Sequence, residues 1–491
     1  TMSASGTITF ADNTAEGHGG AIYMSAASLT VDKNFKFNGN TAGAHGGAIY
    51  LTYKNLEDGT KDGSVLNVFG TVFENNQALG GGAISIRSAC EANVTNAEFI
   101  GNNAEGFDNK DDGDGEGGGA IYVGYGTLSL TNTTFTGNTS SGFGGAIDAV
   151  GATVDITNGD LSGNEALYGG AIYAMSSSKV TVNGTNFTSN MSTYVNSDYN
   201  GNKGGGAISI NGGNLTVTGA TFDSNSSDYY GGTILANGTT VVINGNTVVK
   251  NSVGVTGSAL HFRGSFNATL EDVSIIDNKN AYNGAVYANG GTLNMTNVTA
   301  NGNSATNGGV LYASGNSTVV TIDNCNFSNN SATNGAIYAK NATVTVAGSE
   351  FNANTATNGA SIYGLGSSIT VNNSIFSENI ASTGGAIYTG ESATLNVNGS
   401  EFTDNSAILG GAIYTKASVA EIKDSTFTSN TAKKNSSGSN GNGGAIVVSA
   451  STVTATGNNK FIGNTAENHG GAIYVTYTEN EDNTRTPGIL I

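Results

Sequence analysis

The sequence predicts an all-β protein, a parallel β-helix with three strands per coil and about 17 coils that repeat every 25–27 positions. Three observations lead to this prediction. A Gly-Gly-Ala-Ile-Tyr segment recurs, a Phe-x-x-Asn segment recurs a few residues before it, and an alternating apolar and polar run lies between successive pairs. Units that repeat at a fixed short period bury their hydrophobic side only against their neighbours, and such sequences fold as solenoids.

The Gly-Gly-Ala-Ile-Tyr segment, or a close variant, occurs 17 times, mostly at steps of 25 to 27 positions. Paired glycines permit the positive φ or close backbone approach that a tight corner needs. Side chains alternate along a strand, so an inward Ile predicts an outward Tyr. The second position of each glycine pair is residue 20, 47, 82, 119, 145, 170, 206, 232, 258, 284, 309, 335, 360, 385, 411, 444 and 471.

The Phe-x-x-Asn segment, for example FNGN at 37–40 and FTGN at 135–138, is expected to place its Phe in the core. We expect an Asn at the same place in every coil, where its amide hydrogen-bonds its copies in the coils above and below. Both segments are interpreted as structural. The residues assigned to this asparagine ladder include Asn13, Asn40, Asn138, Asn330, Asn354, Asn379, Asn405 and Asn464.

The third segment has strand character. Runs such as TLSL at 127–130 and TVTV at 343–346 alternate with a period of two and contain β-branched residues. This pattern is typical of a half-buried strand, and no segment shows helical periodicity.

Composition limits the partners. The chain has 491 residues, 74 Gly, 1 Pro, no Trp and a net charge of −19. An acidic surface repels nucleic acid, so no nucleic-acid partner is expected. No apolar run approaches the roughly 18–20 residues of a membrane helix, so we expect no membrane span in this segment. Cys90 and Cys325 are expected to be buried free thiols. The chain starts inside a patterned segment, which we interpret as removal of a signal peptide or as a fragment of a larger protein.

The two motifs together, GGA[ILV] and FxxN, resemble the repeats of the polymorphic outer membrane proteins of chlamydiae. They are also similar to adhesin-like repeat proteins of gut bacteria and methanogenic archaea. The resemblance covers essentially the whole chain, and seventeen ordered pairs make it specific for the repeat class. It implies a surface-exposed passenger or adhesin, sometimes of the autotransporter type, and an extracellular or cell-surface location.

A second, longer period is present. Residues 19–67 match residues 443–491 at a shift of 424, with 26 identities in 49 positions. The match includes Tyr53 and Tyr477, and the acidic insertions after them. We therefore expect residues 1–491 to be one continuous β-helix with a super-repeat of 424 positions. The chain would then be a segment of a giant or polymeric tandem-repeat protein, or a piece that stacks end to end.

The outward tyrosines predict a stacked aromatic stripe along one face. The stripe could bind sugars, pack against a neighbouring fibre, or only stabilise the sheet. The unbroken run consists of Tyr287, Tyr312, Tyr338, Tyr363, Tyr388 and Tyr414.

Four insertions interrupt the coils, at 54–63, 105–117, 191–204 and 433–442, and loops on a rigid scaffold often mediate binding. The sequence DNKDDGDGEGGG at 108–119 offers oxygen ligands for Ca²⁺, or it is a solvated acidic loop. It departs from the EF-hand pattern. We expect no cofactor other than this calcium ion, whose candidate ligands are Asp108, Asp111, Asp112, Asp114 and Glu116.

We interpret the chain as a non-enzymatic extracellular adhesin or fibre segment that mediates attachment through weak contacts repeated along a stiff solenoid. Its expected partners are copies of itself and a host or neighbouring cell surface or glycan. One alternative is a purely structural filament. The other is a polysaccharide-active β-helix enzyme, for which Asp148, Asp155 and Asp160 of one coil are the only carboxylates considered. They fall on different strands and are not expected to converge, so no catalytic residue is assigned.

Overall fold

The computed structural model describes residues 6–106, 117–193, 204–279, 281–479 and 485–491. Every regular element among them is a β-strand. The chain divides into two compact units. Unit 1 comprises Thr1–Val255 and Ala259–His261, and unit 2 comprises Thr256–Ser258 and Phe262–Ile491.

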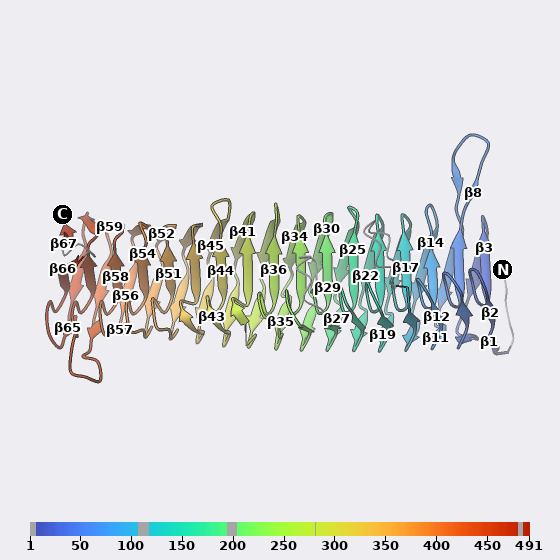
Figure 1. Ribbon diagram of the computed structural model, residues 1–491, viewed down its shortest axis with the longest axis horizontal. Helices are drawn as coiled ribbons and strands as arrows, with labels where there is room; N and C mark the ends of the chain where they lie inside the picture. Colours follow the sequence, from blue (N-terminus) through green and yellow to red (C-terminus); the bar gives the residue numbers. More distant parts are fainter. Residues whose placement is uncertain (1–5, 107–116, 194–203, 280, 480–484) are drawn as a thin grey trace. The chain divides into compact units, whose positions relative to one another are not determined.

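Unit 1 is a stack of parallel coils, whose strands lie side by side in Figure 1. One coil comprises β15 (Glu98–Ile100), β16 (Asn103–Ala104), β17 (Ile121–Gly124) and β18 (Thr127–Thr131). The strands pair in parallel with their equivalents in the next coil, β19 (Thr134–Thr136), β20 (Thr139–Ser140), β21 (Ile147–Val150) and β22 (Thr153–Thr157). Like residues therefore stack on like, with Phe99 beside Phe135 and Ile121 beside Ile147.

Unit 2 repeats the same design. One of its coils comprises β46 (Asn326–Ser328), β47 (Ser331–Asn334), β48 (Ile337–Lys340) and β49 (Thr343–Ala347). The Phe-x-x-Asn strand occurs nine times in unit 1 and eight times in unit 2, which confirms the predicted parallel β-helix of about 17 coils. Beyond the three expected strands, most coils add a short fourth one just after the ladder asparagine, such as β16 or β47.

The Gly-Gly-Ala-Ile-Tyr strands form one column in each unit. In unit 1 they are β3 (Ile22–Ser25), β7 (Ile49–Thr52), β13 (Ile84–Ile86), β17, β21, β25 (Ile172–Met175), β29 (Ile208–Asn211) and β33 (Ile234–Asn237). In unit 2 they include β40 (Val286–Asn289), β44 (Leu311–Ser314), β48, β51 (Ile362–Leu365), β54 (Ile387–Gly390), β58 (Ile413–Lys416), β62 (Ile446–Ser449) and β66 (Ile473–Glu479). The glycine before each strand is needed at the corner. Gly335 has φ +55°, and a Cβ there would collide with the carbonyl oxygen of Ile337.

The core of each unit is a column of phenylalanine rings. In unit 1, the rings of Phe37, Phe73 and Phe99 stack at 4.8–4.9 Å with nearly parallel planes. In unit 2, Phe376 and Phe402 stack in the same way at 4.8 Å. All five side chains are fully buried. The stacking follows from the in-register pairing, because parallel strands lie about 4.8 Å apart.

Beside the phenylalanines runs a buried asparagine ladder, which we call the inner ladder. The Asn102 Nδ2 group donates to Asn138 Oδ1 at 3.0 Å and to the Phe73 carbonyl at 3.0 Å, and the Asn102 backbone N–H donates to the same Asn138 oxygen. Each amide therefore satisfies buried backbone groups as well as its neighbour. The structure places all eight expected asparagines in this arrangement, with Asn13 and Asn464 donating or accepting at the ends of the described runs.

One coil departs from the expected pattern, and the expectation of an Asn in every coil is wrong there. In β35 (Val248–Lys250), Val249 pairs with Phe222, which shifts the ladder position to the fully buried Ser252. The neighbouring Asn251 is exposed and has φ +54°. In the coil of β42 (Thr299–Asn301), the sequence leaves the ladder position open between Asn301 and Asn303, and the structure places Asn303 in the ladder.

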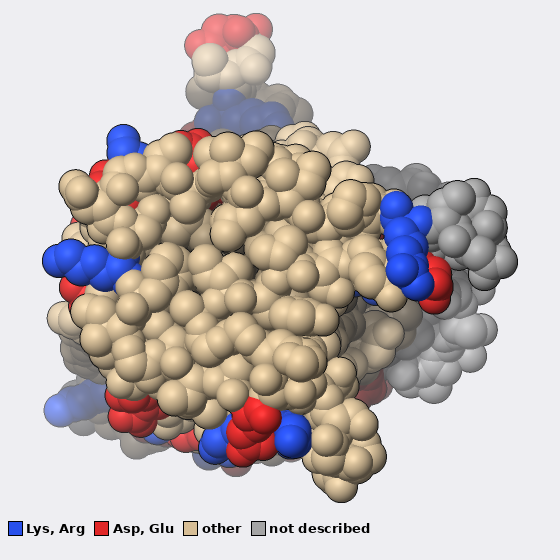
Figure 2. Space-filling model, turned by 90° about the vertical axis from the view of Figure 1, so that its left-hand side faces the viewer, with Lys and Arg blue, Asp and Glu red and all other residues tan. Residues whose placement is uncertain are grey.

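At the last coil of unit 2, charged side chains lie on the outside. Figure 2 looks along the stack onto the last coil of unit 2, and the coloured Lys, Arg, Asp and Glu side chains lie around its perimeter. The middle of this view is occupied by uncharged residues. This distribution follows from the inward Ile, Phe and Asn columns, which leave only outward positions for charged side chains.

Candidate functional site

The outward tyrosines of unit 2 form a continuous column, which we call the tyrosine ladder. Strand pairing sets each Tyr beside the next. The centroids of neighbouring rings lie 4.9–5.5 Å apart, although the ring planes range from parallel to edge-on. Its members, from β40 to β58, are Tyr287, Tyr312, Tyr338, Tyr363, Tyr388 and Tyr414, the six residues of the predicted stripe.

The tyrosine ladder is partly exposed. Tyr338 is its only buried member, with 8% of its surface exposed. Burial raises the pKa of Tyr363, and Glu391 raises it further. Burial also raises the pKa of Tyr312, with a further contribution from Tyr287. Tyr312 and Tyr363 therefore present neutral phenol groups at ordinary pH.

A second row of amides flanks the tyrosine ladder, and we call it the outer ladder. Its members, Asn283, Asn307, Asn334 and Asn358, directly precede the glycine that opens each corner. The Asn307 Nδ2 group donates to Asn283 Oδ1 at 3.1 Å, and the Asn334 Nδ2 group donates to Asn307 Oδ1 at 2.8 Å. The Asn358 Nδ2 group continues the row onto Asn334 at 3.0 Å. Each such bond uses one of the two N–H groups of the donating amide.

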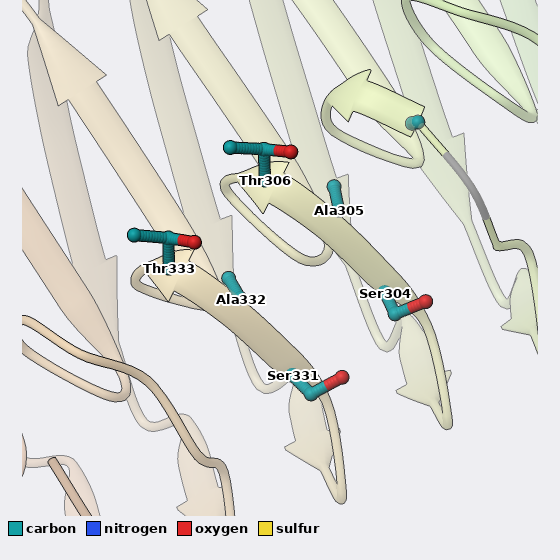
Figure 3. Close-up of a pocket in the computed structure, with 7 residues that line it drawn as sticks. Ser304, Ala305, Thr306, Ser331, Ala332 and Thr333 are labelled. Atoms are coloured by element: carbon teal, nitrogen blue, oxygen red, sulfur yellow. The ribbon is translucent and has the colours of Figure 1, made fainter.

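A shallow groove lies next to the outer ladder, over β39 (Ala281–Asn283), β43 (Ser304–Asn307) and β47. It has a volume of about 450 Å³, and we call it the hydroxyl groove. Figure 3 shows Ser304 above Ser331 and Thr306 above Thr333, with the alanines between the two rows. Its lining residues are Ala281, Ser304, Ala305, Thr306, Ser331, Ala332 and Thr333. The groove therefore consists of hydroxyl groups and methyl groups, without a charged side chain.

In unit 1 most of the same outward column is covered, although Tyr23 in its first coil is 56% exposed. Tyr50, Tyr122 and Tyr173 are only 4–7% exposed, and Ser85 and Asp148 have no exposed surface. Over Tyr50 and Tyr173, the covering groups are rings at the position before a glycine pair, where the coils of unit 2 from Asn283 to Asn358 have asparagine. The Phe143 ring lies 4.6 Å from that of Tyr173, and the His18 ring lies 4.4 Å from that of Tyr50.

The prediction that every Tyr of this column is a surface group is therefore wrong for these three residues of unit 1. They do point away from the core, but turn rings cover Tyr50 and Tyr173, and Arg87 lies over the Tyr122 ring at 5.3 Å from its centre. Burial, then the Asp148 charge, raises the pKa of Tyr173. For Tyr50 and Tyr173, the signal in the sequence was the residue before the glycine pair. It is aromatic or His at 18, 45, 143, 168 and 230, and Asn at 283, 307, 334 and 358.

Each unit contains an antiparallel strand pair in addition to its parallel coils. After β7, β8 (Lys54–Asn55) pairs antiparallel with β9 (Lys61–Asp62), and the hairpin stands out from the coils in Figure 1. The Lys61 Nζ atom lies 4.2 Å from the centre of the Tyr53 ring. In unit 2, β66 pairs in the same way with β67 (Arg485–Pro487), and Arg485 lies 4.2 Å from the centre of the Tyr477 ring. Both the antiparallel pairing and the cation–π contact thus recur on tyrosines that are 424 positions apart.

The proposed calcium ligands Asp108, Asp111, Asp112, Asp114 and Glu116 lie outside the described residues. Within the described ranges, no three His, Cys, Asp or Glu side chains are grouped to hold a metal. Asp148, Asp155 and Asp160 lie on three different strands, β21, β22 and β23 (Asp160–Ser162). Asp148 is fully buried, and its Oδ2 accepts the Gly117 N–H at 2.9 Å.

Cys90 and Cys325 are free and buried. Burial raises the pKa of the Cys90 thiol, and it raises that of Cys325 to about 11. Such thiols are poor nucleophiles at neutral pH. Among the described residues, no helix has the length and apolar character needed to cross a bilayer.

Comparison with known families agrees with this geometry. The family described as Right handed beta helix region matches residues 309–485. The Chlamydia polymorphic membrane protein repeat matches four segments, residues 7–25, 34–52, 70–87 and 132–150. A comparison with curated proteins gave no match.

The two family matches define the class of the protein. It is a parallel β-helix protein with repeats like those of the polymorphic membrane proteins, as the two sequence motifs predicted. Repeats of this kind on this fold indicate a surface-exposed passenger of the autotransporter type. The fold by itself does not define the ligand, which depends on the outward residues.

Proposed function

We propose that this chain is an extracellular adhesin segment that attaches its cell to another surface and has no catalytic activity. One observation gives the main support, the outward face of unit 2, where the tyrosine ladder and the outer ladder run side by side over consecutive coils. Such a face offers the same weak contact once per coil, and repeated weak contacts add up to strong attachment. The family matches add support for a surface location.

The tyrosines suit this role because they combine a large apolar ring with a polar hydroxyl group and need little ordering on binding. In the tyrosine ladder each ring is held by its neighbours at 4.9–5.5 Å, so the face is largely preorganised. Preorganisation reduces the conformational entropy lost on binding.

An attachment assay tests this proposal. Beads coated with the whole chain are allowed to settle on bacterial and epithelial cell layers, and retention under flow is compared with that of albumin-coated beads. We expect retention above the albumin level, and a clear loss when Tyr312, Tyr363 and Tyr388 are all replaced by Ala. Retention no higher than that of albumin on every layer would refute the adhesin role. A matched triple substitution on the exposed positions Thr321, Thr343 and Val419 serves as control.

A purely structural filament is the second candidate. It is favoured by the recurrence of the hairpin, with its antiparallel pairing and its cation–π contact, at the super-repeat spacing. A filament of this kind would bind chiefly to copies of itself. Electron microscopy of the native material distinguishes the two, because a filament predicts long ordered fibres whose formation does not depend on cells.

Release of reducing ends from polysaccharides would instead support the enzyme alternative, and we expect none.

A further inference from the structure

We propose that the hydroxyl groove of unit 2, together with the outer ladder and Tyr282, binds a neutral glycan chain that runs across the stacked strands. This inference rests on the proposed adhesin function and specifies the ligand class of its binding face.

The groove presents hydroxyl groups in two fixed rows. Strand pairing places Ser304 beside Ser331 and Ala305 beside Ala332. Thr306 and Thr333, between these pairs and the outer ladder, form the second row in Figure 3. Each hydroxyl can both donate and accept a hydrogen bond, and the strands hold equivalent groups about 4.8 Å apart. A ligand with many hydroxyl groups at a similar repeat, such as an extended glycan, can bond to both rows at once.

Tyr282 closes one end of the threonine row. Strand β39 pairs Ala281 with Ala305 and Asn283 with Asn307, so Tyr282 takes the outward position that Thr306 and Thr333 occupy in the next two coils. Its side chain is 59% exposed. An exposed aromatic ring beside a row of hydroxyl groups suits a sugar, because the apolar C–H side of the sugar packs on the ring while its hydroxyl groups bond to the polar row.

The outer ladder supplies fixed amide groups on the tyrosine side. Asn283, Asn307 and Asn334 hold one another through bonds of 2.8–3.1 Å, which use one N–H group of each donating amide. The second N–H group of such an amide is available to a ligand hydroxyl. Because neighbouring amides fix each other, these donors lose little entropy when they bind.

The charge of the chain disfavours the binding of polyanions such as nucleic acids and sulfated glycans. The chain has a net charge of −19, and the groove lining contains no charged residue. The nearest charges before β39, Lys279 and Asp277, form an ion pair at 3.2 Å. A nucleic acid or a sulfated glycan would be repelled by the overall charge and would find no cation in the groove. A neutral glycan meets neither obstacle, and the groove volume of about 450 Å³ falls within the range of roughly 300–1,000 Å³ typical of small-ligand sites.

Calorimetry on the whole chain tests the proposal, with neutral β-linked oligosaccharides of glucose, xylose and N-acetylglucosamine as the probes and heparin as the charged comparison. We expect at least one neutral series to bind, with affinity rising with chain length, and heparin not to bind. The double variant Thr306→Val/Thr333→Val keeps the side-chain shape and removes two hydroxyl groups, so affinity should fall by about tenfold or more. Tyr282→Ala should have a similar effect.

The exposed Thr321 of β45 (Val319–Asp323), on another face, provides the matched control, and Thr321→Val should bind like the parent. Absence of binding by every neutral series, or binding that the groove variants leave unchanged, would overturn the proposal. The same variants in the bead assay separate the two proposals. Normal retention with lost glycan binding would leave the adhesin function standing and reject the groove as its contact. Glycan binding without retention on any cell layer would reject the adhesin function and retain the groove.

Discussion

The two units use the same coil but differ in one outward column. In unit 1, Tyr173 is 4% exposed beneath Phe143, whereas in unit 2 Tyr363 is partly exposed beside Asn358. The cause is the residue before the glycine pair, because a ring there reaches over the column and an asparagine does not. For this pair of tyrosines, the residue before the glycine pair accounts for the difference between a buried and a partly exposed ring.

The largest expected loss of stability comes from substitutions in the inner ladder, which both units share. Asn379→Ala removes an amide that accepts bonds from the Asn354 backbone and side chain and donates to the Phe351 carbonyl at 2.9 Å. Several buried polar groups lose partners, so the free energy of unfolding should fall by about 3–6 kcal/mol. Urea unfolding followed by circular dichroism measures this. Asn138→Ala in unit 1 should have a comparable effect, and Asn358→Ala in the outer ladder should cost about 1 kcal/mol or less. Equal losses at the inner and outer ladders would contradict the distinction.

The next effect tests the difference directly. Tyr173→Ala opens a cavity in unit 1 and should lower the free energy of unfolding by about 3–5 kcal/mol. Tyr363→Ala removes a partly exposed ring and should cost about 1 kcal/mol. Hydrogen exchange read peptide by peptide assigns each loss to its own unit. If the two substitutions were equally costly, the contrast between a covered and an open column would be wrong.

The loss of stability at alkaline pH tests the contributions of the two buried thiols, one in each unit. In unit 2 the folded pKa of Cys325 is about 11 against an ordinary value of 9.0, so the unfolded chain releases this proton first. The stabilisation is fully present below pH 9 and is lost as the pH rises to about 11, a decrease of about 2–3 kcal/mol. Stability curves of Cys325→Ala and the parent should differ in slope over this window. Cys90→Ala tests unit 1, where burial also raises the pKa. If the free energy of unfolding of the parent fell with pH no more steeply than that of Cys325→Ala, the proposed contribution of the Cys325 thiol would be refuted.

Substitution of the turn rings in unit 1 should make its covered tyrosine column more exposed, like the tyrosine ladder of unit 2. Tyr168 and Phe143 both lie over Tyr173, with ring centres at 6.0 and 4.6 Å from it. The double variant Phe143→Asn/Tyr168→Asn should expose Tyr173 and raise its nitration by tetranitromethane to the rate of Tyr363, as read by peptide mass spectrometry. The lost ring contacts should cost about 1–3 kcal/mol. Unchanged nitration of Tyr173 would show that other groups bury it.

The smallest effect concerns the hairpins. Lys61→Ala and Arg485→Ala each remove a cation from a Tyr ring at 4.2 Å, and an exposed cation–π contact contributes about 0.5–1 kcal/mol. We expect faster hydrogen exchange in β8 and β9, or in β67, without a change in the coils. Slowed or unchanged exchange in both hairpins would remove the evidence that this contact holds them.

Much of the fold could be predicted because each rule is local and repeated. Phe and Ile recur at positions whose alternation turns them inward, and any in-register parallel stack then brings Phe99 onto Phe135. Prediction failed where the repeat is imperfect. The two candidate asparagines near Thr299–Asn301, and the shift to Ser252, were settled only by strand pairing.

The face was harder to predict than the core. The tyrosine run of unit 2 is visible in the sequence, but the outer ladder and the hydroxyl groove arise only when Asn283, Asn307 and Asn334, or Thr306 and Thr333, are stacked. Each is an ordinary turn residue in its own coil. These asparagines and threonines recur with the period of the coil, but from the sequence alone we interpret the recurring turn residues only as corners of the chain.

The sequence alone determined the solenoid, its period and its inward columns, because hydrophobic burial acts on every coil in the same way. Only the tertiary structure decided which outward residues reach solvent. That outcome depends on whether a turn side chain extends over its neighbour, as Phe143 does over Tyr173 and as Asn358 does not over Tyr363. Whether an outward side chain is buried depends on the residues of the neighbouring turns, and the pattern within its own strand does not specify this burial.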